Sequence, residues 1–252
     1  MMLRFGLKKH AAFTLVGLIV LTTSGCSGVQ LKKRQKPVQV VYRFDDHRWL
    51  ELHGIACQGA LWFVDEKRDI RSEVSSQFYR IFTKPYINAS ERYIAIPSWD
   101  SAHFTVSRDY GRTWRPSSIK GREDDEAGSD YPESKNIASL TVVNDQGFLL
   151  TKQGHLYMSS LPFDDPRIMP GGEGIDYSYT FKGKVYHDRL EAIRPGKGEN
   201  VSRWGLFYVD PRILPELITK HYANFQNLPT RVPEVTGYTG WTHMQCDMKA
   251  GM

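Results

Sequence analysis

The sequence contains few cysteines, no long hydrophobic run and none of the common catalytic motifs. Three cysteines in 252 residues exclude a disulfide-dense miniprotein. The apolar stretch at residues 11–21 is shorter than the roughly 20 residues that a transmembrane helix needs. The patterns H-E-x-x-H, C-x-x-C, G-x-S-x-G and the phosphate-binding loop do not occur. We therefore predict no enzymatic activity, no metal site and no cofactor.

The composition is that of a folded protein. Hydrophobic residues make up 40% of the chain and aromatic residues 12%, which excludes a disordered or collagen-like protein. The length fits one domain of about 200 residues or two small ones.

The basic character of the chain is concentrated near its N-terminus. The formal net charge of +5 by itself suggests nucleic acid or an anionic membrane as a partner. However, seven of the 33 Lys and Arg residues lie in residues 1–37, which hold no acid, so 26 remain against 28 Asp and Glu. The rest of the chain is about neutral, and we predict no nucleic-acid partner. The seven basic residues are Arg4, Lys8, Lys9, Lys32, Lys33, Arg34 and Lys36.

Residues 1–25 are typical of an export signal, with basic residues, an apolar stretch and then small residues. The segment Thr23-Ser24-Gly25-Cys26 resembles a bacterial lipobox, in which the chain is cut before a cysteine that carries diacylglycerol. Thr23 stands where that pattern usually has Leu, and a plain secretory signal with an incidental Cys26 is the alternative. Ser27 is not the Asp associated with inner-membrane retention. The pattern therefore predicts a lipoprotein of the outer membrane that faces the periplasm.

Residues 26–37 are polar and basic and show no periodicity. We interpret them as a lipidated tether that acts as a solvated linker; contact of its charges with anionic headgroups is the alternative.

From residue 38 to residue 252 we expect a single β-rich domain. Apolar and polar residues alternate with a period of two in short segments that are separated by turn residues. The segments 144–147 and 152–155 have the composition of hairpin turns. One short helix is expected near residues 215–226, where Pro215 precedes an apolar face. The expected strands are 38–44, 61–64, 93–96, 104–106, 139–143, 147–150, 155–158, 177–181 and 206–209.

The strongest local motif is an Asp-box, S-x-D-x-G-x-T-W, formed by Ser107, Asp109, Gly111, Thr113 and Trp114. The aspartate can accept backbone N–H groups across a turn, the glycine can take a positive φ, and the tryptophan can pack beneath the loop. The motif predicts a hairpin turn and says almost nothing about activity.

In known structures, Asp-boxes lie between the outer strands of β-propeller blades. At roughly 40–45 residues per blade, the domain has room for about five small blades. We therefore expect a propeller-like fold, with a β-sandwich as the alternative. A single box and the absence of an Arg-Ile-Pro signature argue against a sialidase.

Two further groups of residues have alternative interpretations. With Cys26 lipidated, Cys57 and Cys246 remain as an even pair, which we predict to form a disulfide in an oxidising compartment; two buried thiols are the alternative. Asp45-Asp46-His47 could bind a metal, but a turn cap or an ion pair with Arg43 or Arg48 is favoured because adjacent strand residues point to opposite faces.

Several segments together resemble lipoprotein immunity proteins of type VI secretion systems, specifically those that protect against the third family of antibacterial phospholipase effectors. The segments are 40–52, Cys57, 61–65, 93–98, the Asp-box turn and 240–246.

This resemblance implies a tethered protein that binds a cognate lipase toxin in the periplasm and protects the cell from attack by itself and its siblings. No toxin-contacting residue can be carried over, because the shared motifs are fold determinants. A periplasmic propeller-fold hydrolase acting on glycans or lipids is one alternative function, and a non-catalytic envelope scaffold lipoprotein is another.

Overall fold

The computed structural model describes residues 36–100, 103–120, 131–159, 166–167, 170–181, 183–192, 206–208 and 231–252. The chain divides into two units, residues 1–35 and residues 36–252. The export signal, Cys26 and most of the tether therefore lie outside the described residues. Within the described part of the chain, no helix has both the length and the apolar character needed to span a membrane.

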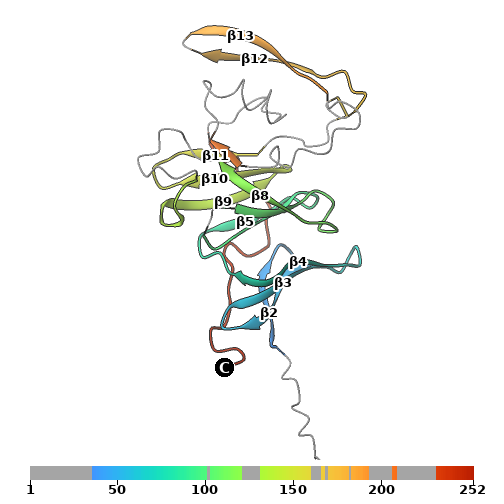
Figure 1. Cartoon of the computed structure of the whole chain (residues 1–252), viewed down its shortest axis with the longest axis vertical. Coiled ribbons are helices and arrows are strands. Elements are labelled where there is room, and N and C mark those ends of the chain that lie inside the picture. Colours follow the sequence, from blue (N-terminus) through green and yellow to red (C-terminus); the bar gives the residue numbers. More distant parts are fainter. Residues whose placement is uncertain are drawn as a thin grey trace, which may run out of the picture. The chain divides into compact units, whose positions relative to one another are not determined.

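The first sheet is a four-stranded antiparallel meander in the order β1-β2-β3-β4 (Figure 1). Its second strand alternates as a half-buried strand does: Leu50 and Leu52 are buried, and Trp49, Glu51 and His53, which alternate with them, face outward. A two-residue turn joins β2 to β3, and Ala56 and Cys57 both take positive φ values there, 48° and 62°. These values are typical of a primed hairpin turn, whose twist matches that of the flanking strands. The strands are β1 Val38–Arg43, β2 Arg48–Ile55, β3 Gln58–Asp65 and β4 Ile70–Arg80.

The second sheet has eight strands in the order β5-β9-β10-β11-β14-β8-β7-β6. The pairs β5–β9 and β14–β8 are parallel, and the other neighbours are antiparallel. The predicted turns at 144–147 and 152–155 connect β9, β10 and β11 as expected. The strands are β5 Tyr86–Asn88, β6 Ile94–Pro97, β7 His103–Ser107, β8 Arg115–Lys120, β9 Ile137–Val143, β10 Gln146–Thr151, β11 Leu156–Met158 and β14 Leu206–Tyr208.

The two edge strands of this sheet, β5 and β6, are linked through the side chain of Asn88. Its Oδ1 accepts a hydrogen bond from the backbone N–H of Ala95 at 3.1 Å, and its Nδ2 donates to the carbonyl of Ser90 at 2.9 Å. The hydroxyl of Tyr86 also donates to the Ala95 carbonyl at 2.9 Å. Side chains therefore join the edges, and no backbone ladder closes the sheet.

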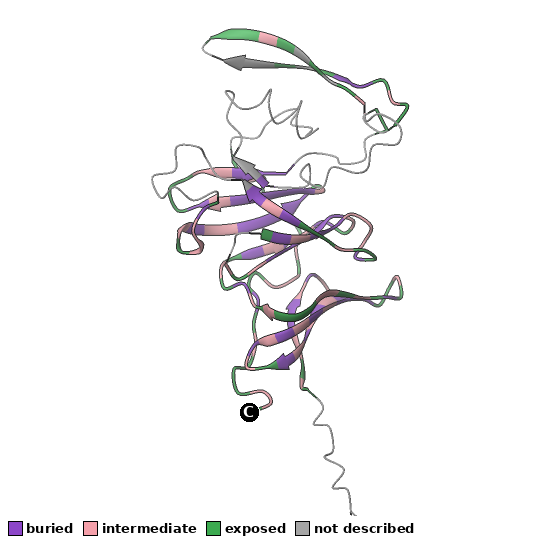
Figure 2. Ribbon diagram, viewed as in Figure 1, coloured by how far each residue is buried: buried purple, intermediate pink, exposed green. Residues whose placement is uncertain are grey.

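The four-stranded and eight-stranded sheets share one hydrophobic core. Figure 2 shows buried residues concentrated in the strands of both sheets. Tyr42 and Phe44 meet edge to face at a centroid distance of 4.9 Å, and Tyr42 also packs on Tyr86 of the second sheet at 4.6 Å. Phe44 continues the contact to Phe63 at 5.6 Å. Such aromatic pairs add to the stabilisation that burial alone provides.

Residues 231–252, which we name the C-terminal strap, run without regular secondary structure between the two sheets. Trp241 N and Gln245 N donate to carbonyls of β1, those of Arg43 and Val41, each at 2.8 Å. On the other side, Tyr86 N of β5 donates to the carbonyl of Thr242, also at 2.8 Å. The strap thus occupies the free backbone edge of β1 and bridges it to β5.

The remaining regular elements are small. Strands β12 Ile175–Phe181 and β13 Lys184–Leu190 form a separate two-stranded antiparallel sheet. The 3-10 turn η1 spans Ser134–Asn136 and precedes β9. The helix predicted near 215–226 falls outside the described residues, which contain no α-helix.

The prediction of a mainly β fold is confirmed, but a propeller is not shown. In the described ranges the strands form open sheets of four, eight and two strands, and none closes into a ring of blades. The physical reason is that an Asp-box specifies one hairpin turn. It does not determine how many strands join on either side, which depends on pairings such as β5–β9 and β14–β8 between segments far apart in the sequence.

Candidate functional site

The outward side of the four-stranded sheet carries a cluster of aromatic and charged side chains, which we name the outer face. The strand register aligns them in cross-strand rows. One row crosses all four strands and contains Arg43 of β1, Trp49 of β2, Val64 of β3 and Arg71 of β4. In the next row of this face, Glu51 of β2 pairs with Trp62 of β3. Directly opposed residues on neighbouring strands have side chains on the same face. The outer face comprises Arg43, Trp49, Glu51, His53, Trp62 and Arg71.

Glu51 is the centre of the hydrogen bonds on this face. Its Oε1 accepts from Trp49 Nε1 at 3.0 Å, and its Oε2 accepts from Arg71 Nη2 at 2.6 Å. The same oxygen lies 3.2 Å from His53 Nε2. Burial raises the pKa of Glu51, but the hydrogen bonds from Arg71, Trp49 and His53 outweigh burial and lower this pKa to about 2. The carboxylate is therefore charged at neutral pH and holds its neighbours in fixed orientations.

Cation–π contacts fix the two tryptophans further. The guanidinium of Arg71 lies 5.6 Å from the centre of the Trp62 ring, and that of Arg43 lies 5.3 Å from the centre of the Trp49 ring. The His53 and Trp62 rings are 5.9 Å apart. Tryptophan and arginine are the residue types most enriched at the centres of protein interfaces, and held rigidly they lose little conformational entropy on binding. The arrangement is therefore that of a preorganised binding surface.

The acidic turn at residues 45–47 is organised by internal bonds. Ligand atoms of Asp45, Asp46 and His47 lie within 4.8 Å of one another, which is close enough to consider a metal ion. However, Asp45 Oδ1 accepts the backbone N–H groups of His47 and Arg48, and its Oδ2 accepts from Arg48 Nε at 2.7 Å. This is the turn cap and ion pair that the sequence favoured.

The Asp-box residues lie in the turn between β7 and β8. Asp109 Oδ1 accepts from Thr113 N at 2.9 Å, and its Oδ2 accepts from the Thr113 hydroxyl at 2.6 Å. Gly111 N donates to Ser107 Oγ at 2.8 Å. Burial raises the pKa of Asp109, but the hydrogen bonds from Thr113 and Ser107 outweigh burial and lower it below its usual value.

This turn also packs against the four-stranded sheet. Trp114 Nε1 donates to Ser72 Oγ of β4 at 2.8 Å, and the Trp114 ring contacts Phe63 of β3 at a centroid distance of 5.6 Å. Gly111 has a φ of 84°, and its Cα faces the same phenyl ring. The Asp-box turn therefore acts as a structural contact between the sheets.

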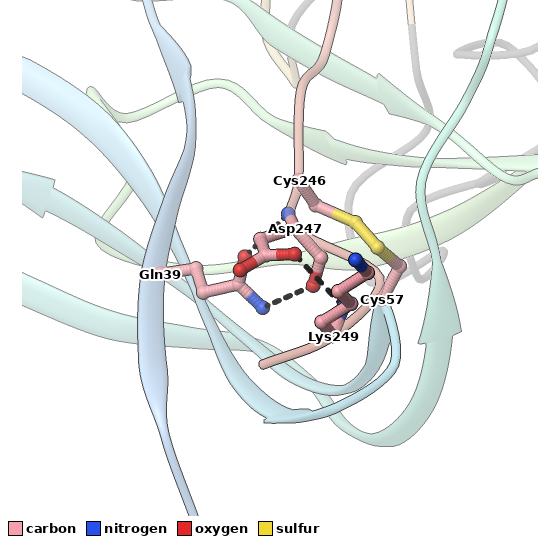
Figure 3. The surroundings of a disulfide bond; sticks show 5 residues. All are labelled: Gln39, Cys57, Cys246, Asp247 and Lys249. Carbon is pink, nitrogen blue, oxygen red and sulfur yellow. Dashed lines mark hydrogen bonds between the residues drawn. A yellow bond between two sulfur atoms is a disulfide. The ribbon is translucent and has the colours of Figure 1, made fainter. Parts of the chain in front are cut away.

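Cys57 and Cys246 form a disulfide across 189 residues of sequence, with their Cα atoms 5.9 Å apart (Figure 3). Beside it, Gln39 of β1 holds the strap through both polar atoms of its side-chain amide. Oε1 accepts from Asp247 N at 2.7 Å, and Nε2 donates to Asp247 O at 3.4 Å. The bridge attaches the strap to the β2–β3 turn.

Comparison with known proteins bears on the segment that contains the outer face. Residues 34–151 match the family model of the T6SS Tli3 immunity protein. Over this segment the chain is similar to the T6SS Tli3 immunity proteins. The Tli3 match, in which T6SS stands for type VI secretion system, confirms the family resemblance inferred from the sequence. No curated protein matches the chain.

The Tli3 segment contains the whole four-stranded sheet, the Asp-box turn and the strands β5 to β10. Every outer-face residue lies inside it. Cys246 and the rest of the strap lie beyond it, although they complete the contacts of β1 and β5.

Sequence reasoning did not single out any member of the outer face as a site residue, except that Arg43 was considered as an ion-pair partner of the acidic turn. A signal was available, because Trp49, Glu51 and His53 alternate with buried leucines and therefore share one face of a strand. Trp62 and Arg71 join them only through the register of β3 and β4, which the sequence does not reveal.

Proposed function

We propose that this protein is a membrane-anchored immunity protein of the cell envelope that binds a type VI secreted phospholipase and blocks its action. The observation that carries the proposal is the Tli3 family match, which supports an immunity role and implies a toxin as the partner. The export signal, the lipobox-like Cys26 and the basic tether support a site of action in the periplasm at the outer membrane.

The task requires affinity and position, and it requires no catalytic residues. A phospholipase must reach a bilayer to act, so a protein that covers its active site or its membrane-facing surface inhibits it. Anchoring the inhibitor on the same membrane raises its effective concentration where the toxin arrives. A binding role also agrees with the immunity family.

We place the toxin contact on the outer face. It lies entirely within the Tli3-matched segment, its tryptophans and arginines are typical of interface centres, and Glu51 holds them in place before a partner arrives. Loss of a central Trp or Arg side chain typically weakens a complex by about 2 kcal/mol or more, which is roughly a thirtyfold loss of affinity.

The direct test needs the cognate lipase, which is to be sought among the genes next to this one. We expect periplasmic expression of the lipase to kill cells, co-expression of this protein to rescue them, and the two proteins to purify together. Unchanged killing together with no complex would refute the proposed function.

Once the cognate lipase is in hand, two variants of the outer face, Trp62→Ala and Arg71→Glu, test where it binds. Phe78→Ala is the matched control, because Phe78 is an exposed aromatic side chain on β4, at the edge of the same sheet. We expect the two outer-face variants to lose about thirtyfold in affinity by titration calorimetry while their urea denaturation midpoints show that they remain folded. If Phe78→Ala weakens the complex and the outer-face variants do not, the contact lies at the edge of the sheet and the assignment is wrong.

A further inference from the structure

We infer that the end of the domain formed by the C-terminal turn and the adjacent strand ends rests on the surface of a phospholipid bilayer. This surface, which we name the apolar pole, comprises Pro37, Val38, Ile55 and residues 247–252. It adjoins the outer face at Val38, which pairs with His53, but it has a different composition. The inference rests on the anchoring at Cys26 that belongs to the proposed function.

The pole exposes apolar side chains that the described part of the chain leaves uncovered. The exposed fractions are 55% for Val38, 46% for Ile55, 61% for Met248 and 73% for Met252. An added Cβ on Gly251 would lie 2.8 Å from Pro37 Cγ and 3.2 Å from Ile55 Cγ1, so the turn sits directly against the strand ends. These residues therefore form one contiguous surface, and Figure 1 shows the C-terminus beside this end of the sheet.

The backbone of the pole is held firmly. Ala56 N of the β2–β3 turn donates to the carbonyl of Ala250 at 3.3 Å, and Gly54 N donates to that of Pro37 at 3.1 Å. The Cys57–Cys246 disulfide lies directly before the turn. The two methionines are thus flexible apolar side chains on a rigid support, which suits insertion among lipid headgroups and acyl chains.

The position at which the chain enters the domain favours a membrane as the occupant. The described chain begins at Lys36, next to Pro37, and nine residues lie between Cys26 and Lys36. A chain of this length spans at most about 35 Å, even when it is fully extended. A lipid anchor at Cys26 would therefore keep the point where the chain enters the domain, next to the apolar pole, within that distance of the bilayer.

The charges near the pole also suit an anionic bilayer. Lys32, Lys33 and Arg34 precede it, and residues 1–37 contain no acid. The turn itself carries Lys249 and one acid, Asp247. Each basic residue near an anionic surface contributes favourably, and apolar side chains add a contribution that does not depend on salt.

The experiment uses the processed chain, residues 26–252, with Cys26→Ser so that no acyl chain contributes. Residues 36–252 form a compact unit separate from residues 1–35, so removal of the leader leaves the domain intact. Binding is measured by flotation with vesicles of phosphatidylethanolamine and phosphatidylglycerol at 3:1, and with phosphatidylcholine vesicles. We expect stronger binding to the anionic vesicles, and we expect each of Met248→Gln and Met252→Gln to weaken it by about fivefold.

Phe78→Gln is the matched control, because it removes an apolar side chain of similar exposure that belongs to neither the pole nor the outer face. Its binding should equal that of the parent chain. Absence of vesicle binding, or equal losses in Phe78→Gln and the methionine variants, would overturn the inference. So would dissociation of a dimer by the methionine variants in gel filtration, because the pole would then bind a second copy.

A separate measurement keeps this inference distinct from the proposed function. Inhibition of the lipase on a detergent-dispersed substrate should be unaffected by Met248→Gln and Met252→Gln, because the outer face is unchanged. Loss of that inhibition would place the toxin on the pole and refute the membrane assignment. Failure of the parent chain to inhibit the lipase would instead refute the proposed function, whatever the vesicles show.

Discussion

Gly111 and Gly154 allow the packing of the Asp-box turn to be tested with a matched pair of substitutions. Their φ values are nearly identical, 84° and 85°. A Cβ on Gly111 would lie 2.3 Å from Phe63 Cε1, whereas a Cβ on Gly154 would meet nothing within 4 Å. The two Gly→Ala variants therefore share the backbone strain and differ only in the clash.

The magnitudes follow from these two contributions. A left-handed conformation costs an alanine about 1 kcal/mol, and this applies at both positions. At Gly111 the added methyl group must also displace the Phe63 ring, which is fully buried between Phe44 and Trp114. Overpacking of this kind costs about 1–3 kcal/mol. We expect Gly111→Ala to lower the free energy of unfolding by about 3 kcal/mol and Gly154→Ala by about 1 kcal/mol.

Urea denaturation followed by tryptophan fluorescence measures this difference. With a slope of about 2 kcal/mol per molar urea, the Gly111→Ala midpoint should fall about 1 M below that of Gly154→Ala. Adding Phe63→Leu should recover part of the loss, because the smaller side chain makes room for the methyl group. Equal midpoints for the two alanine variants, or strict additivity with Phe63→Leu, would refute the argument.

Three further predictions concern the disulfide, the outer face and the open edge of the second sheet. Cys57→Ser with Cys246→Ser should lower the free energy of unfolding by up to about 4–5 kcal/mol, and a reductant should do the same to the parent chain while leaving the double variant unchanged in the same urea titration. The folded-state pKa of Glu51 is about 2, against an ordinary 4.5, so its contribution is complete above pH 4.5 and is lost as the pH falls toward 2. Between pH 4.5 and pH 2, the free energy of unfolding of Glu51→Gln should therefore fall by roughly 2–3 kcal/mol less than that of the parent chain. An equal fall in both proteins would contradict the role of this carboxylate. Asn88→Ala leaves the Ala95 N–H without its acceptor and should cost about 2–3 kcal/mol. Asn88→Asp should cost at least as much, because it keeps that acceptor but sets a buried carboxylate oxygen against the Ser90 carbonyl, and a smaller loss would contradict the role of the side-chain amide.

The segments that the sequence predicted well are those with an apolar alternation or a recognisable turn. Asn144 and Asp145 take φ values of 52° and 57°, and the hairpin they form was expected from their composition. Strand β4 was not predicted, because it is a polar edge strand whose pairing with β3 supplies what its own sequence lacks. The sequence also did not predict the arrangement of the sheets, since β14 and β8 are far apart in the sequence and pair through only two residue pairs.

The candidate site shows the same limit. The alternation in β2 places Trp49, Glu51 and His53 on one face, and a reading of that strand alone could have found them. The ion pair between Glu51 and Arg71 depends on the register of three strands, including a bulged pairing between β3 and β4. Register is set by the packed core, so the full cluster emerges only at the level of the folded domain.

The C-terminal strap determines the order in which the domain can be completed. The backbone carbonyls of β1 and the amide of Tyr86 form hydrogen bonds with Trp241, Thr242 and Gln245, which are synthesised about 200 residues after β1. Contacts between such distant parts of the chain form slowly, and a growing chain presents its first strands long before their last partner. A chain threaded N-terminus first through an export channel would therefore stay unfinished, and able to pass, until its final segment emerged.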